Sequence, residues 1–159
     1  MKYVLTDEGV EEGGLFLYRI QALRSFGGVR SGELGGYVES DYNLSHDGDC
    51  WVSGDAKVYG NARVSGDSRV SGDARIFGTS YISGEVCISG TAHVSGDSWI
   101  TGTIEISGDV WVAVSRYKNS PIYGDLKLDH GTWTGYILLR GNYYLLSPTL
   151  ETMSVKKYV

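Results

Sequence analysis

Between residues 52 and 112, an aliphatic side chain occurs at every sixth position without a slip. Glycine stands two positions after each of the first ten, a small polar or acidic residue follows it, and the next residue is small or apolar. The chain has 23 glycines and two prolines, which points to repeated tight corners rather than to collagen or disorder. The aliphatic residues are Val52, Val58, Val64, Val70, Ile76, Ile82, Ile88, Val94, Ile100, Ile106 and Val112.

Each hexad of this pattern has the composition of one short strand and one corner. A β-branched residue that points inward between outward neighbours favours a strand. Glycine followed by Asp, Asn or Thr favours a corner, because glycine tolerates positive φ and these side chains close turns. A six-residue period is too short for a hairpin or a strand–helix unit, so the units must coil, each buried under the next. The pattern therefore predicts an all-β chain.

Residues 51–112 resemble the hexapeptide-repeat family closely. The resemblance implies a left-handed parallel β-helix of triangular section, with three hexads in each 18-residue coil. Residues 18 apart would then stack, with a first wall that starts at Val52, a second at Val58 and a third at Val64. Ten hexads make a little over three coils, about 15 Å tall at strand spacing. So short a stack needs a cap at each open end.

Residues 1–50 are expected to form an N-terminal hairpin and an opening coil. Lys2–Leu5 and Leu15–Leu23 have the composition of strands, and the glycine- and acid-rich segment Glu8–Gly14 joins them as a turn. Further along, Val38 and the leucine six residues after it repeat the hexad spacing two residues out of phase with the main run. This offset predicts an irregular opening coil.

The segment that leads into the repeat identifies a narrower group of proteins than the repeat itself does. The residues concerned are Leu34–Ser40, Asn43–Ser45 and Asp49–Val52. This segment resembles the leader of a group of bacterial and phage-encoded hexapeptide-repeat proteins that includes those called YdcK-like. The resemblance covers roughly residues 2–112. It implies a phage or prophage setting more than a particular chemistry.

The C-terminal part changes character. Ile122–Leu128 returns to the repeat after a loop at residues 115–121, so the β-helix is expected to span residues 51–128. Residues 129–159 are expected to form an antiparallel hairpin, either as a cap on the open end or as an aromatic interaction module. Its strands and turn are Trp133–Leu139, Arg140–Asn142 and Tyr143–Leu146.

Charge and composition narrow the function classes. The net charge of −5 provides no basic footprint for direct nucleic-acid binding. No apolar run approaches the roughly 20 residues of a spanning helix, and the N-terminus lacks the apolar core of a signal peptide, so no membrane association is expected. Cys50 and Cys87 are too few for a disulfide framework or a cysteine-rich zinc site. We expect a cytoplasmic protein of a bacterial host cell, without metal or cofactor.

An enzyme is the first alternative, because the family resemblance includes acyltransferases that use acyl thioesters. Such enzymes need a histidine as general base. His93 is the best candidate, since it occupies an outward position of the repeat, whereas His46 and His130 lie in the irregular ends. Each histidine is better explained as a solvated surface residue, and the run of hexads lacks the long loop usual in these acyltransferases. We therefore expect no catalytic residue.

A second alternative is an acidic nucleic-acid mimic. Acidic residues recur at the corners near strand spacing, which imitates a ladder of phosphates. Four cations interleave with them one position before the aliphatic residues, and they weaken the resemblance to a phosphate stripe. These cations are Lys57, Arg63, Arg69 and Arg75.

Large aromatic residues at outward positions favour a binding module. Tyr59 and Phe77 are 18 apart and should be vertical neighbours on one wall, and Tyr81 and Trp99 form a second such pair. Adjacent exposed aromatics indicate apolar patches, unless the terminal segments cover that wall. The expected partner-binding residues are Tyr59, Phe77, Tyr81, Trp99, Trp111, Trp133, Tyr143 and Tyr144.

These observations together favour a non-enzymatic β-helix that associates with itself and binds a protein. A flat-walled prism with aromatic pairs favours a homotrimer, packed wall to wall, and a host protein is a further possible partner. The phage-like leader suggests a phage- or prophage-encoded protein that inhibits a bacterial defence system.

Overall fold

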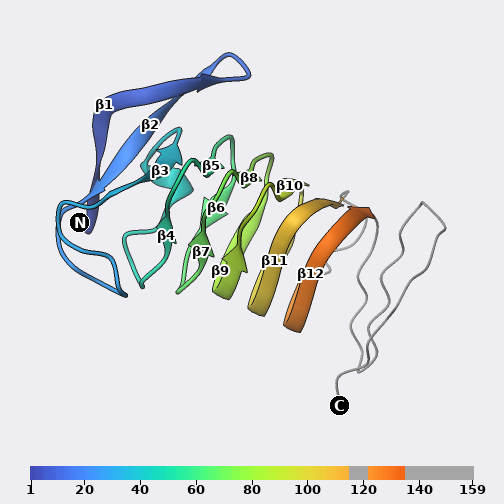
Figure 1. Cartoon of the computed structure of the whole chain (residues 1–159). Helices are drawn as coiled ribbons and strands as arrows, with labels where there is room; N and C mark the ends of the chain where they lie inside the picture. Colours follow the sequence, from blue (N-terminus) through green and yellow to red (C-terminus); the bar gives the residue numbers. More distant parts are fainter. Residues whose placement is uncertain (115–121, 135–159) are drawn as a thin grey trace.

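The computed structural model describes residues 1–114 and 122–134, and there the chain is an all-β solenoid of about four turns of stacked parallel coils (Figure 1). The strands are very short in the first coils and longer in the last ones. They are β4 (Trp51–Val52), β5 (Lys57–Val58), β6 (Arg63–Val64), β7 (Arg69–Val70), β8 (Arg75–Ile76), β9 (Tyr81–Ile88), β10 (His93–Gly96), β11 (Trp99–Val114) and β12 (Ile122–Thr134).

The strand register confirms the coil of three hexads. Val52 pairs with Val70, Val70 with Ile88, and Ile88 with Ile106, so residues 18 apart stack in parallel. All eleven repeat aliphatics are at most 1% exposed and form one continuous core with the apolar residues two positions before them. Where that position is a serine, the serine is buried too. Burying each such side chain contributes about 1.5–3 kcal/mol. The hydrophobic period thus specifies both the register and the interior of the prism.

The opening coil joins the same walls two residues out of phase, as the sequence predicts. In β3 (Leu34–Val38), Val38 pairs with Val58, twenty residues on instead of eighteen. After the short 3-10 helix η1 (Asp41–Asn43), Leu44 stacks on Val64 with the same offset. The two additional residues therefore lie between Leu44 and Val52, where the chain takes eight residues for one hexad. This enlarged corner receives the N-terminus.

The N-terminal hairpin consists of β1 (Tyr3–Glu12) and β2 (Leu15–Ala22), paired antiparallel. The turn is only Gly13–Gly14, with φ of 57° and 83°, as two-residue hairpin turns require. The prediction that Glu8–Gly14 is a turn was wrong over Glu8–Glu12, since these residues continue β1 beyond an irregularity in its register. Because β2 pairs with β3 and β3 with β5, the hairpin continues the sheet of the second wall (Figure 1).

At the other end, β12 runs parallel to β11, with Ile122 against Ile100 and Trp133 against Val112. The solenoid therefore reaches Thr134 instead of ending at residue 128. Trp133 and Thr134 belong to this parallel strand and not to an antiparallel hairpin. The predicted loop at residues 115–121 and the rest of the predicted hairpin lie outside the described residues.

Candidate protein-binding surface

The N-terminal segment covers the upper part of the first wall. Trp51 stands at an outward position of this wall but is only 2% exposed. Phe26 packs edge-on against its indole with ring centroids 5.4 Å apart, and Tyr3 does so at 6.3 Å. One coil further, the Arg69 guanidinium donates a hydrogen bond to the Gly27 carbonyl. On this wall the chain therefore covers its own outward aromatic residue.

The hairpin tip lies against the second wall. The Glu12 carboxylate forms ion pairs with Lys57 Nζ at 2.5 Å and with Arg75 Nε at 3.3 Å. Tyr59 and Phe77, on the same coils, stack face to face with centroids 5.3 Å apart, and both are half-buried. Burial, and after it the Glu12 carboxylate, raises the pKa of Tyr59. The first predicted aromatic pair thus forms, but it lies beside the hairpin tip rather than on a fully open surface.

Replacing Glu12 with Gln should loosen the hairpin without unfolding the solenoid. Hydrogen bonding to Lys57 holds the pKa of Glu12 below its usual value of 4.5. A carboxyl group with a depressed folded-state pKa stabilises the fold above its unfolded pKa, and this contribution disappears as the pH falls through the folded value. In urea titrations at pH 7, the variant should lose about 0.5–1 kcal/mol. The two proteins should converge as the pH falls below 4.5, and an undiminished difference at low pH would contradict the ion-pair origin.

Further down the second wall, His93 stacks on Trp111 with ring centroids 5.2 Å apart. Its Nδ1 lies 2.9 Å from the Thr91 carbonyl oxygen, and its strand neighbour on the other side is Arg75. Trp111 itself is 48% exposed. The half-buried histidine and the exposed tryptophan together form an aromatic pair below the hairpin.

The third wall carries the second predicted pair. Tyr81 and Trp99 pair directly in the register of β9 and β11, and their rings meet edge to face at 6.3 Å. They are 40% and 46% exposed. Above them, the Arg63 guanidinium lies over the Tyr42 ring, 5.5 Å from its centroid. The N-terminal segment therefore reaches the top of this wall, but the aromatic pair stays accessible.

The remaining predicted residues are placed only in part. The backbone of Trp133 has the register position of Val112, which belongs to the inward column of the second wall. His130 lies on the same strand, opposite Asp109. Tyr143 and Tyr144 lie outside the described residues.

Two exposed aromatic residues of the hairpin are absent from the predicted set of binding residues. Phe16 and Tyr18 are exposed, and their rings meet edge to face at 5.0 Å. The signal was available, because β2 is apolar at successive positions in Leu15–Tyr18 and so cannot bury both of its faces against one wall.

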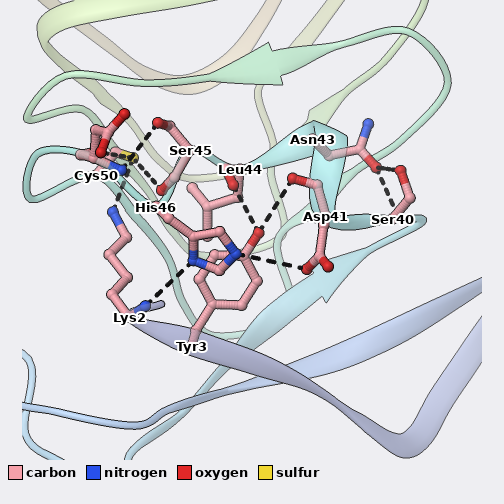
Figure 2. A network of polar contacts seen from close by, with 10 residues as sticks. Lys2, Tyr3, Ser40, Asp41, Asn43, Leu44, Ser45, His46 and Cys50 are labelled. Carbon is pink, nitrogen blue, oxygen red and sulfur yellow. Dashed lines mark hydrogen bonds and ion pairs between the residues drawn. The ribbon is translucent and has the colours of Figure 1, made fainter.

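A polar network at the enlarged corner was also missed, and Figure 2 shows it. The Tyr3 hydroxyl donates a 2.6 Å hydrogen bond to the Leu44 carbonyl, and His46 stacks on the Tyr3 ring at 4.3 Å. Burial lowers the pKa of His46, although Asp41 opposes the shift from 3.9 Å. The Lys2 amide donates to His46 Nδ1. His46 therefore helps to hold Lys2 and Tyr3 at the enlarged corner and is not a freely solvated residue. We call these contacts the N-terminal anchor.

Comparison with models of known protein families and with curated proteins found no match. Within residues 1–114 and 122–134, no helix has the length and apolar character that a membrane crossing requires. The same residues contain no group of three or more His, Cys, Asp or Glu side chains placed to hold a metal ion.

Proposed function

We propose that this protein is a non-enzymatic solenoid that associates with itself and binds a partner protein through its outward aromatic residues. The observation that supports this most is the accessible pair Tyr81–Trp99 on the third wall. Elsewhere the N-terminal segment covers Trp51 and lies beside Tyr59. Two large rings left accessible side by side on a flat sheet favour burial against another protein.

A trimer fits the placement of these patches better than a two-fold dimer. A closed ring needs two different patches on each copy, whereas a two-fold dimer needs one patch that faces itself. Tyr81 and Trp99 on the third wall and Trp111 on the second lie on either side of the corner at residues 95–98. With this corner directed toward a three-fold axis, the rings of the third wall in each copy would lie next to Trp111 on the second wall of the following copy.

Light scattering of the intact protein tests this assembly. We expect three times the chain mass of 17.3 kDa for the wild type. Trp99→Ser and Trp111→Ser should each give the mass of a single chain, because each removes one side of the same interface. Tyr18→Ser, which removes an exposed aromatic on the hairpin, should remain trimeric. A monomeric wild type would refute self-association, and a dimer sensitive to Trp99→Ser alone would refute the ring.

The biological part of the proposal rests on the resemblance of the leader at residues 34–52. We propose a phage- or prophage-encoded protein that acts in the bacterial cytoplasm on a host protein, as an inhibitor of a defence system. A host protein that co-purifies with the wild type and with Tyr18→Ser, but not with Trp99→Ser, would link this role to the third wall.

One observation favours a hexapeptide-repeat acyltransferase as the second candidate. The contact between His93 Nδ1 and the Thr91 carbonyl would fix the tautomer in which Nε2 is free to accept a proton. A general base requires this arrangement. Coenzyme A binding by calorimetry, together with acyl transfer that His93→Ala abolishes while it keeps the binding, would favour the enzyme over the binding module.

A further inference from the structure

The enlarged corner of the opening coil brings a buried cysteine and a buried lysine together. Cys50 takes the small inward position that alanine holds in the next two hexads, and it is fully buried. Its sulfur faces the corner formed by the two additional residues, 3.4 Å from the Ser45 carbonyl oxygen. A cysteine here places a nucleophilic sulfur where the regular repeat has only a methyl group.

The side chain of Lys2 enters this corner from the N-terminus (Figure 2). Lys2 is fully buried, its Nζ donates to the Gly48 carbonyl at 3.1 Å, and it lies 3.2 Å from Cys50 Sγ. The ring of Phe26 lies 5.0 Å from the same nitrogen. None of the ion pairs among the described residues includes Lys2. A lysine buried without a carboxylate is costly, so its contact with sulfur is an unusual feature of this corner.

We propose that Lys2 and Cys50 are the site of a reversible oxidative crosslink, a sulfenamide bond between Nζ and Sγ that forms on exposure to hydrogen peroxide. Peroxide transfers one oxygen to the thiol, so the sulfur is oxidised to sulfenic acid and the peroxide is reduced to water. The amine lone pair then attacks the sulfur, the S–O bond breaks, and the hydroxyl group leaves as water with one amine proton. Any further proton on the lysine passes to solvent. A thiol reductant cleaves the S–N bond and restores both side chains.

The geometry favours condensation over further oxidation of the sulfur. The two atoms are already 3.2 Å apart, so the bond forms without a rearrangement of the backbone. Cys50 is fully buried, so peroxide reaches its sulfur only when the N-terminal segment opens locally. Burial also raises the pKa of the thiol, against the opposing effect of Lys2. Reclosure then returns the amine to the sulfur.

The other cysteine provides a comparison within the same chain. Cys87 is exposed, and its strand neighbours in register are Arg69 and Glu105, neither of which carries a nucleophilic amine. It should oxidise faster than Cys50, and without an internal crosslink. The crosslink would instead tie the N-terminus to the opening coil, across a sequence separation of 48 residues, and restrict the unfolded chain.

Intact-mass spectrometry of the Cys87→Ser protein, treated with hydrogen peroxide, tests the proposal. We expect a loss of about 2 Da, the two hydrogens given up by sulfur and nitrogen, and its reversal by dithiothreitol. Tryptic digestion should yield a peptide pair that links Lys2 to Cys50. In Lys2→Arg, which keeps the positive charge, and in protein oxidised in concentrated urea, the linked pair should be absent.

Mass gains of one or more oxygens on Cys50, with Lys2 unlinked in the folded protein, would overturn the proposal. A linked pair that carries an additional oxygen would equally contradict a direct bond between nitrogen and sulfur. If Lys2→Arg does not fold, the comparison between native and urea-treated Cys87→Ser protein still decides. In urea the sulfur is more accessible to peroxide, so a link that forms only in the folded protein requires the native proximity of Lys2.

Discussion

Replacing Gly72 with alanine is expected to destabilise the solenoid by about 2–5 kcal/mol, through two effects at one position. Gly72 has φ of 66°, in the left-handed region that costs an L-residue about 1–2 kcal/mol. An added methyl group would also lie 2.8 Å from the carbonyl oxygen of Gly90 and 3.0 Å from its amide nitrogen. These are backbone atoms of the next coil, so relief requires the coils to separate. Urea denaturation measures the loss directly.

Gly14→Ala is the matched control, because it isolates the first of these effects. Gly14 has φ of 83° in the hairpin turn, and nothing lies within 4 Å of an added methyl group. Its substitution should lower the free energy of unfolding only by the cost of the left-handed φ, about 1–2 kcal/mol. Equal losses for the two variants would show that the stacked corners tolerate a methyl group. The glycine period would then reflect the turn alone.

The sequence specified the solenoid because its determinants are local and repeated. A six-residue period of inward aliphatics, with a glycine at each corner, leaves only a coil as the way to bury every unit. The two-residue offset of Val38 and Leu44 likewise predicted the irregular opening coil, since register is counted along the chain. In contrast, Glu8–Glu12 has no apolar alternation and was expected to be a turn. It is a strand because β2 provides its hydrogen-bonding partner.

The difference between local spacing and contacts with distant segments also explains how much of the candidate site was predictable. The 18-residue spacing predicted that Tyr81 would meet Trp99, and that Tyr59 would meet Phe77, because spacing determines which rings are vertical neighbours. It could not predict which pair is accessible. That depends on the docking of the N-terminal segment, and the contact of Glu12 with Lys57 spans 45 residues of sequence.

The four repeat cations show this dependence most clearly. The sequence alone presents them as charges that weaken an acidic stripe. In the structure each one contacts the N-terminal segment, and together they hold it to all three walls. The contacts are Lys57 and Arg75 with Glu12, Arg69 with the Gly27 carbonyl, and Arg63 with the Tyr42 ring.

Trp51→Ala is expected to destabilise the protein by about 3–5 kcal/mol, the usual cost of truncating a buried tryptophan. The indole is 2% exposed and lies between Phe26 and Tyr3, so its loss leaves a cavity between the first wall and the N-terminal segment. Because Tyr3 also stacks on His46, the variant should loosen the whole anchor at the enlarged corner. Urea denaturation measures the loss, and amide hydrogen exchange should show faster exchange in β1 and β2.

Trp111→Ala removes the same residue type from the same position of the repeat, the residue before an inward valine. Its indole is 48% exposed in the single chain and contacts His93 on one face. In the Trp99→Ser background, where both variants are compared as monomers, its loss should cost less than about 1 kcal/mol. If the two variants were equally destabilised, the N-terminal segment would contribute little to burying Trp51. Trp51 and Trp111 are equivalent in the repeat. A large difference between the two variants would show that the N-terminal segment, which covers only Trp51, distinguishes them. The N-terminal segment would then determine which aromatic residues of the walls remain free to bind a partner.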